Sequence, residues 1–324
     1  MKNKKILIIG KQNHLGWIEH TINGFLSNNY EVKHFFTNKL SLKNTFLKSI
    51  YKGIKKDDLS LQLDELDNLI KNFKPNIAVF VGAFFVDKEL FALCKEKKII
   101  TIGWVGDLFY EDKTTYVDIL DFLYVSDSAF IENAKNYGFK NVNLLQFGYD
   151  ENLHINNNII RNNSINFVGS FTRERDLAFQ KISNYPMQIH GTKWEKLNNI
   201  SQKWNISNKK VSQQKIVNIY NSTLATLNVA QKENIINMAN MRCFEATACG
   251  SCLINDNVKD IELCFEPEKE ILIYNSLEEL EGIVEKLQKD NFFAKKIAKN
   301  GEKRVKNSNY SYKYRTATIM QNFQ

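Results

Sequence analysis

Short apolar runs alternate with amphipathic stretches through the first half of the chain. Runs rich in Ile, Val, Leu and Phe occur at 6–10, 31–36, 77–82, 99–105, 122–126 and 142–148. Between most of them, apolar residues recur at helical spacing within polar sequence. Strands that alternate with helices in this way are typical of βαβ units, whose strands form a parallel sheet. The pattern therefore predicts a Rossmann-like α/β domain over residues 1–152.

The same alternation returns after a polar, Asn-rich segment at 151–164, which we interpret as an interdomain linker. A second Rossmann-like domain is predicted over 165–305, and the tail 306–324 either stays with it or returns to the first domain. Two such domains are expected to face each other across a cleft, with ligands in the loops after the strands. Strands are expected at 165–170, 187–190, 224–229, 251–254 and 271–274, and helices are expected to begin near Glu174, Ser212, Met241 and Leu277.

Composition narrows the class of protein. A length of 324 residues suits two domains, since a domain usually holds about 100–200 residues. The 43% of hydrophobic and 25% of charged residues are ordinary values for a folded soluble chain. The cysteines are few and odd in number, and the first apolar run is too short for a signal peptide. We therefore expect a cytoplasmic protein without disulfides. The longest apolar run, 77–86, is too short to span a membrane.

The net charge of 44 − 36 = +8 suits an anionic partner. A phosphorylated small molecule, an anionic lipid surface and nucleic acid all fit its sign. The lysines are spread along the chain without a nucleic-acid motif or an aromatic basic stripe, so nucleic acid is not expected as a partner.

One candidate phosphate site is the loop GSFTRER at 169–175, between an expected strand and an expected helix. Gly169 allows close backbone approach, and Arg173 and Arg175 stand at the helix start, whose amide groups also attract phosphate. The alternative is an ordinary strand-to-helix turn with solvated arginines. Gly191, in HGTKW at 190–194, follows the next strand and belongs to a similar loop.

A second candidate is MRCFEATACG at 241–250. A helix that begins near Met241 places Arg242 and Glu245 on one face, and its small residues allow close packing of the other face. A guanidinium suits a phosphate, and a carboxylate accepts hydrogen bonds from two vicinal hydroxyls, so the pair fits a nucleotide. The alternative is an i,i+3 surface ion pair, and the residues alone favour neither.

The first domain offers candidates for a catalytic base. Asp107 follows a strand in WVGDLFYED, and His14 and His20 follow the first strand in GKQNHLGWIEH. Each could act as the base or contact an acceptor. The alternatives are a turn or cap role for Asp107 and a solvated or core-edge ring for each histidine.

Two further features concern membranes and metals. The segment KNTFLKSIYKGIKK at 43–56 combines apolar residues at helical spacing with lysines, so it either contacts an anionic membrane or packs on its own domain. Cys243, Cys249 and Cys252 have no paired histidine set, so zinc is not expected. No two Asp residues stand two positions apart, so an Asp-x-Asp metal clamp is missing. We expect no metal and no other cofactor.

The order of motifs in the second half resembles that of the CgeB-like glycosyltransferases, a family of GT-B fold with a C-terminal domain of the group 1 type. R-x-x-E-A-x-A-C-G at 242–250 carries most of the resemblance, and SCLIND, ELCFEPEKEILIYNSLEEL and GEKRVKNSNYSYKYR follow it. Upstream, FVGSFTRERD and IHGTKW stand where the family has its strand-Gly-Arg and nucleotide-base loops. The resemblance covers 165–315, and residues 1–150 share only the general plan.

The resemblance implies transfer of a sugar from a nucleotide sugar to a cell-envelope glycan, lipid or protein acceptor. Glu245 would hold the ribose, Arg242 and the 169–175 loop the diphosphate, and Gly191 would flank the base. Without a metal, Arg173, Arg175 and Arg242 would stabilise the leaving group. The resemblance implies retention of the anomeric configuration, and retaining relatives often have a Glu, seven residues and a second Glu. Here Asn237 stands in place of the first Glu, so the donor-sugar contact stays open.

Two other functions fit the same architecture. A nucleotide-sugar epimerase of GT-B fold would need no acceptor and would leave the nucleotide attached to the sugar. A binding protein would keep the nucleotide site without turnover.

Overall fold

The computed structural model describes residues 4–13, 15–39 and 58–323. It contains two compact units, one formed by Met1–Leu145 with Thr316–Gln324 and the other by Gln146–Arg315. Each unit holds a six-stranded sheet in which every paired strand is parallel. The predicted α/β fold class is confirmed.

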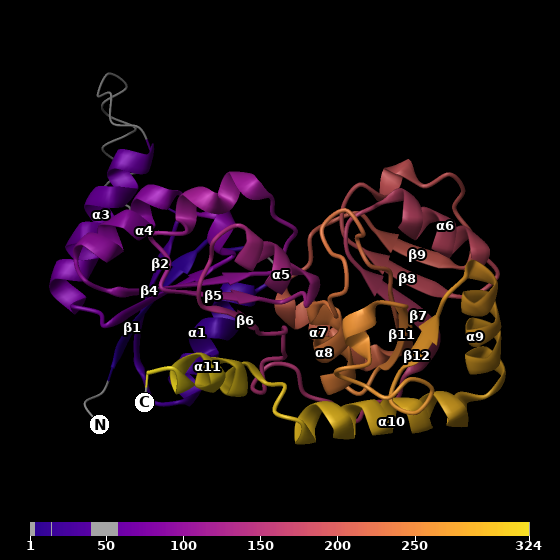
Figure 1. Cartoon of the computed structure of the whole chain (residues 1–324). Helices are drawn as coiled ribbons and strands as arrows, with labels where there is room; N and C mark the ends of the chain where they lie inside the picture. Colours follow the sequence, from indigo (N-terminus) through magenta and orange to yellow (C-terminus); the bar gives the residue numbers. More distant parts are fainter. Residues whose placement is uncertain (1–3, 14, 40–57, 324) are drawn as a thin grey trace, which may run out of the picture. The chain divides into compact units, whose positions relative to one another are not determined.

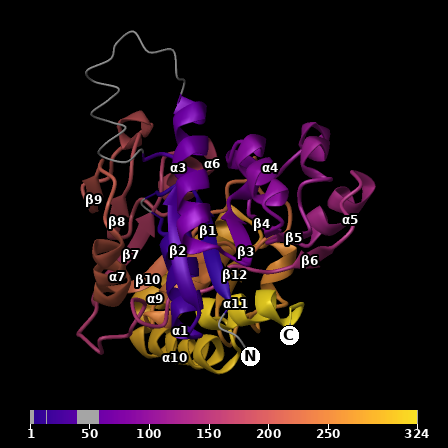
Figure 2. The same ribbon diagram turned by 90° about the vertical axis from the view of Figure 1, so that its left-hand side faces the viewer.

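The first unit has the strand order β2-β1-β3-β4-β5-β6. Figure 1 and Figure 2 show helices α3 and α4 on one side of this sheet and α1 on the other. The strands are β1 (Lys5–Gly10), β2 (Glu31–Phe36), β3 (Ile77–Val81), β4 (Ile100–Val105), β5 (Phe122–Val125) and β6 (Val142–Leu144). The helices are α1 (Trp17–Ser27), α3 (Asp58–Phe73), α4 (Lys88–Glu96) and α5 (Ala129–Asn136), with 3-10 turns at Ala83–Phe85 and Glu111–Tyr116.

The second unit has the strand order β12-β11-β10-β7-β8-β9. Helix α6 packs against α9, and α8 packs against α7 and α10. The strands are β7 (Asn162–Val168), β8 (Met187–His190), β9 (Trp204–Ser207), β10 (Thr223–Asn228), β11 (Cys252–Asp256) and β12 (Leu272–Tyr274). The helices are α6 (Arg173–Lys181), α7 (Gln213–Ser222), α8 (Met241–Ala248), α9 (Leu277–Lys289) and α10 (Asn291–Asn307), with 3-10 turns at Trp194–Lys196 and Lys259–Ile261. Helix α11 (Tyr312–Gln321) begins in this unit, and from Thr316 onward it belongs to the first unit.

Side-chain caps fix where the helices of the second unit begin. The hydroxyl of Ser212 accepts from the Lys215 amide at the start of α7, and that of Ser276 accepts from Glu279 at the start of α9. Such caps satisfy amide groups that have no partner within the helix. The helix starts expected near Ser212, Met241 and Leu277 are confirmed.

Three boundaries differ from the expectation. Strand β9 was not predicted, because this short edge strand offers only Trp204 and Ile206 as an apolar alternation. Strand β7 begins at Asn162, inside the segment interpreted as a linker. Strand β6 ends at Leu144 and not at residue 148, because the chain there leaves the first sheet: the Phe147 carbonyl accepts from Arg315, and Tyr149 pairs with Ser311.

Among the residues that the structure describes, no helix is both long and apolar enough to cross a membrane.

Candidate functional site

The start of helix α8 is built from a network of asparagine side chains. The Asn240 side chain caps the helix by accepting from the Arg242 amide at 3.1 Å. Its amide group donates to the Asn228 side chain at 3.0 Å, and Asn228 in turn donates to Asn255 at 2.5 Å. Asn228 ends β10 and Asn255 lies in β11, so two strand ends hold this helix start in place.

Arg242 is fixed by this network and by the end of β7. Its guanidinium donates to the Asn228 side chain and to the Val168 carbonyl, and it lies 4.8 Å from the centre of the Phe167 ring. The predicted alternative, an ion pair with Glu245, is not formed. A guanidinium has five N–H donors, so these bonds leave others for a ligand.

Arg175 lies over the same aromatic ring. Its side chain is 7% exposed, and the guanidinium is 5.1 Å from the Phe167 ring centre. It donates to the Ser170 carbonyl at 2.6 Å and to the Val229 carbonyl at 3.3 Å. Burial and, to a smaller extent, the positive charge of Arg242 lower the pKa of Arg175 to about 10. Through these hydrogen bonds Arg175 holds two loops together.

The two guanidinium groups concentrate positive charge at the carboxyl ends of β7 and β10. Within the described ranges, no carboxylate lies at ion-pair distance from Arg175 or Arg242, and the buried Asp256 carboxylate attracts both guanidinium groups only from beyond that distance. Burying cations beside one another is unfavourable unless an anion compensates them. This part of the second unit is therefore suited to binding an anion.

Two glycines bring the adjacent loops into backbone contact. The Gly169 amide donates to the His190 carbonyl at 2.8 Å, and the Gly169 carbonyl accepts from the Trp194 indole at 3.1 Å. Gly191 has φ of 149°, and a β-carbon there would lie 1.8 Å from the Gly169 oxygen. Only glycine fits this position. Arg173 is exposed at the first position of α6, so it can reach a ligand beside these loops.

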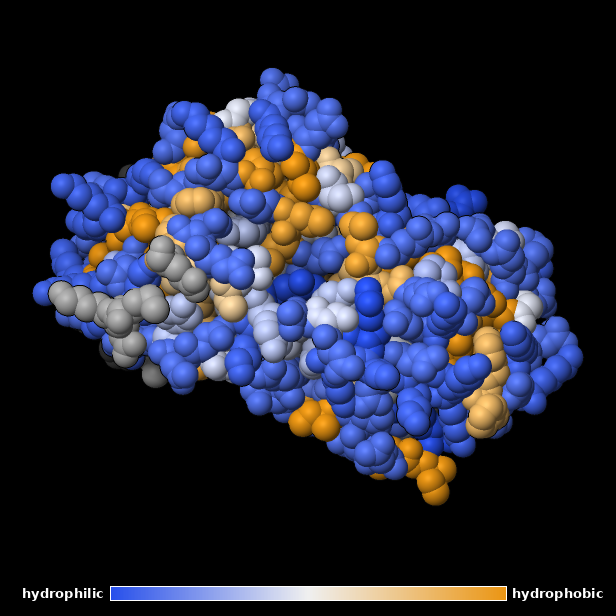
Figure 3. All heavy atoms as spheres, turned by 60° about the horizontal axis from the view of Figure 1, so that its bottom comes forward, coloured by the Kyte–Doolittle hydropathy of each residue, from blue (hydrophilic) through white to orange (hydrophobic). Residues whose placement is uncertain are grey.

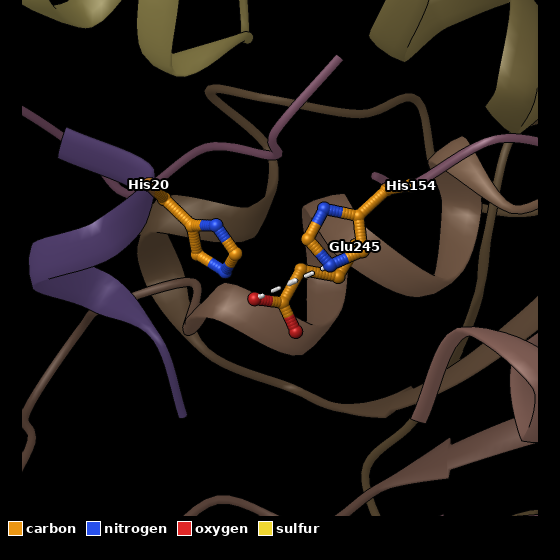
Figure 4. Close-up of side chains that lie close together, drawn as sticks. All are labelled: His20, His154 and Glu245. Carbon is orange, nitrogen blue, oxygen red and sulfur yellow. Dashed lines mark ion pairs between the residues drawn. The ribbon is translucent and has the colours of Figure 1, made fainter. Parts of the chain in front are cut away.

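Glu245 lies one turn along α8 and is buried beside His154. The Glu245 Oε1 atom is 3.9 Å from His154 Nε2, and Figure 4 marks this contact with a dashed line. His154 Nδ1 accepts from the Asp150 amide at 3.0 Å, so in the neutral ring Nε2 carries the proton and faces Glu245. Burial, then the negative charge of Glu245, raises the pKa of both Tyr220 and Tyr312.

His190 stands at the end of β8, directly before Gly191. The ring is buried, and neither nitrogen has a hydrogen-bond partner among the described residues. Burial lowers its pKa, and Lys215 lowers it further, so the ring is neutral at neutral pH. A buried polar ring without partners is unusual and is expected where a ligand completes the site.

Asp256 ends β11 beside a pocket of about 280 Å³ that Glu174 and Lys232 also line. Its Oδ2 accepts from the Ala230 amide at 2.9 Å, whereas Oδ1 has no partner in the described part of the chain. Burial raises the pKa of Asp256.

The first unit holds the candidates for a base. Asp107 is half-buried after β4 and lines a pocket of about 120 Å³ with Gly82 and Lys113. His20 is buried on α1. His14 and the segment 43–56 lie outside the described residues.

All five cysteines are free and buried. Burial raises the pKa of the thiols, to about 12 for Cys94 and Cys252, so these groups are not activated as nucleophiles.

The structure brings together Arg242, Arg175 and Gly169 around Phe167, and Gly191 next to Gly169. His154, Asn228 and His190 are not among the residues expected from the sequence. His154 lies in the polar segment interpreted as a linker, and its contact with Glu245 joins residues that are distant in sequence. Asn228 and His190 each end an apolar strand, which is the signal that could have identified them.

The sequence and the fold of this chain are similar to those of known proteins. Residues 173–321, just under half of the chain, match a family model described as glycosyl transferase-like. No curated protein sequence gives a significant match.

Solved structures share the fold at low sequence identity. A glycosyltransferase from Rickettsia africae has a TM-score of 0.71 at 13% identity, covering 99% of this chain and 98% of the other. Anabaena HepE, solved in complex with UDP and glucose, has a TM-score of 0.70 at 9% identity, covering 98% and 99%. A putative UDP-N-acetylglucosamine 2-epimerase from Listeria monocytogenes has a TM-score of 0.58 at 11% identity, covering 100% and 97%. The chain thus has the GT-B fold, and the family match supports a glycosyl transferase.

Proposed function

We propose that this protein transfers a sugar from a nucleotide-sugar donor to an acceptor. The observation that carries the proposal is the pair of guanidinium groups of Arg175 and Arg242, which lie over the Phe167 ring without a carboxylate partner in the described chain. A diphosphate supplies the anion that this arrangement lacks.

The remaining donor contacts follow from their positions around this pair. Glu245 accepts hydrogen bonds from the two ribose hydroxyls, with His154 orienting its carboxylate. His190 and the Gly191 backbone contact the base, which satisfies the buried imidazole nitrogens. The base is proposed to be uracil, by analogy with the UDP complex of HepE. A closer relation to CgeB-like enzymes stays a prediction.

Chemistry at this site depends on stabilising the departing nucleoside diphosphate. Arg242, the exposed Arg173 and the free amide groups at the start of α6 donate to the charge that develops on the leaving phosphate. Arg175 positions the loop that carries Arg173. We propose that the transfer needs no metal ion and retains the anomeric configuration, with Asn237 at the position of the donor-sugar contact.

The first unit is proposed to bind the acceptor, a cell-envelope glycan, lipid or protein, and to supply the base. Asp107 is the leading candidate, with His14 and His20 as the others. Asp107→Asn should lower kcat far more than it weakens UDP binding. Equal losses of turnover and of UDP affinity would reject the assignment of Asp107 as the base.

The fold also fits an epimerase, since the similar Listeria structure is that of a putative UDP-N-acetylglucosamine 2-epimerase. Incubation with a panel of UDP-sugars, with and without candidate glycan or lipid acceptors, separates the functions. A transferase releases UDP and yields a glycosylated acceptor, and EDTA leaves its rate unchanged. An epimerase converts the donor with the nucleotide still attached, and a binding protein leaves it intact; either outcome would reject the proposal.

A further inference from the structure

The second unit carries a pocket that the proposed function does not use. Its volume is about 540 Å³, and it lies where the 156–163 segment meets the first turns of helix α10. The Asn291 side chain donates to the Asn163 side chain at 3.0 Å, which holds the helix start against this segment. Asn156, Ile160, Arg161, Lys295, Lys299 and Glu302 are among its lining residues.

The charge at this pocket is positive. Arg161, Lys295 and Lys299 line it, with Glu302 as its carboxylate. Glu302 is already engaged, because it accepts from Asn156 at 2.7 Å and pairs with Lys306. The Arg161 guanidinium donates to backbone carbonyls, among them that of Cys249 at 2.6 Å, so its charge is fixed beside the pocket without a carboxylate partner in the described chain. An anion with several oxygens, such as a phosphate group, fits this lining.

The outer face of α10 extends the positive charge beyond the pocket. Ala294, Ile297 and Val305 are buried against the unit, so the opposite face is exposed. Lysines recur on that face at helical spacing, and none forms an ion pair with a carboxylate in the described ranges: Lys295, Lys296, Lys299 and Lys303. Figure 3 views the side on which α10 lies and shows mainly hydrophilic residues, with a few hydrophobic groups standing out.

Large apolar side chains are exposed in this pocket and next to it. Ile160, which lines the pocket, is 98% exposed, and Phe292, which follows the lining residue Asn291 in the chain, is 78% exposed. Phe292 precedes Lys295, Lys296 and Lys299 by three, four and seven positions, so it shares their face of α10. Exposed apolar groups beside unpaired lysines are typical of surfaces that bind anionic bilayers, where the lysines meet the headgroups and the apolar side chains insert below them.

We propose that the rim of this pocket and the outer face of α10 dock on an anionic phospholipid bilayer, with a headgroup phosphate in the pocket beside Arg161. The apolar rim favours a bilayer over nucleic acid, which would leave Ile160 and Phe292 in water. This surface is distinct from the segment 43–56, and it does not depend on the proposed transferase activity.

Sedimentation with vesicles tests the proposal on the full chain. Wild type should bind vesicles that contain phosphatidylglycerol, bind pure phosphatidylcholine much less, and dissociate as salt rises. Lys295→Gln with Lys299→Gln should weaken binding about 30-fold, or about 2 kcal/mol at about 1 kcal/mol per lysine. Phe292→Ser should weaken it at constant charge. The exposed pair Lys209→Gln with Lys210→Gln serves as the matched control and should bind like wild type.

Other outcomes would overturn the proposal. One is vesicle binding that survives the α10 substitutions but disappears with Lys48→Gln and Lys52→Gln in the segment 43–56. Another is equal binding to both vesicle types, or none. If soluble glycerol phosphate binds while vesicles do not, the pocket takes a small phosphate compound. If RNA competes and Phe292→Ser has no effect, the surface binds a polyanion. Thermal unfolding of each variant checks that it is folded.

Discussion

Replacing Arg175 with Met tests whether this residue stabilises the two loops that it joins, as distinct from binding the donor. The substitution removes hydrogen bonds from a charged group to the carbonyls of Ser170 and Val229, worth about 1.5–3 kcal/mol for each acceptor, or roughly 3–6 kcal/mol together. Against this stands the cost of holding the guanidinium buried beside Arg242. Its pKa falls from 12.5 to about 10, which corresponds to about 3 kcal/mol.

Subtracting about 3 kcal/mol from roughly 3–6 kcal/mol leaves a net loss of up to about 3 kcal/mol in the free energy of unfolding, with a middle value of about 1.5 kcal/mol. For a unit of this size, a loss of about 1.5 kcal/mol lowers Tm by roughly 3–6 °C. Scanning calorimetry of wild type and Arg175→Met measures the loss directly. A variant that is as stable as wild type would show that the hydrogen bonds to the two carbonyls do not outweigh the cost of burying the guanidinium. The proposed role of Arg175 in holding the two loops together would then be wrong.

The exposed Arg173 provides the matched control, two positions earlier on the same helix start. Arg173→Met should change stability by less than about 0.5 kcal/mol, because the side chain is exposed. It should weaken UDP affinity about 10- to 150-fold through loss of a charged hydrogen bond to the diphosphate. Unchanged UDP affinity in Arg173→Met would remove this residue from the donor site.

Two further predictions concern single sites in the second unit. Gly191→Ala should lower Tm and abolish UDP binding, because the added β-carbon would lie 1.8 Å from the Gly169 oxygen. Thermal unfolding with and without UDP measures both effects, and a variant with wild-type Tm would contradict that backbone contact. Asp256→Asn should be more stable than wild type at pH 7. Burial raises the folded pKa of Asp256 above its unfolded value, so the wild-type fold loses stability as pH rises through the folded pKa and the carboxyl group ionises. The gain in Tm should shrink as pH falls toward about 4, and a gain that is independent of pH would reject ionisation as its cause.

The sequence predicts well what depends on local pattern. Buried strands such as β3 are continuous apolar runs, and helices α7 and α9 begin at serine caps, so their positions follow from nearby residues. Edge strand β9 is short and only partly buried, and its pattern is correspondingly weak.

The site depends instead on contacts between distant parts of the chain. Arg175 stands visibly at a helix start, but the Val229 carbonyl that it holds is 54 residues away. The Arg242 guanidinium donates to Val168, which is 74 residues earlier. His154 was taken as part of a polar linker, because nothing near it in the sequence indicates that Glu245 lies beside it. Residue types therefore identified the candidates, and only the fold shows which contacts each of them makes within the protein.

The start of α8 is proposed to hold the nucleotide of the donor. Calorimetric titration of UDP into wild type and into Glu245→Ala measures this contact. We expect saturable binding by wild type and by the exposed control Glu262→Ala, and an affinity about 10- to 150-fold weaker in a Glu245→Ala variant that thermal unfolding shows to be folded. Wild-type affinity for UDP in Glu245→Ala, or no UDP binding by the wild-type chain, would contradict the proposal.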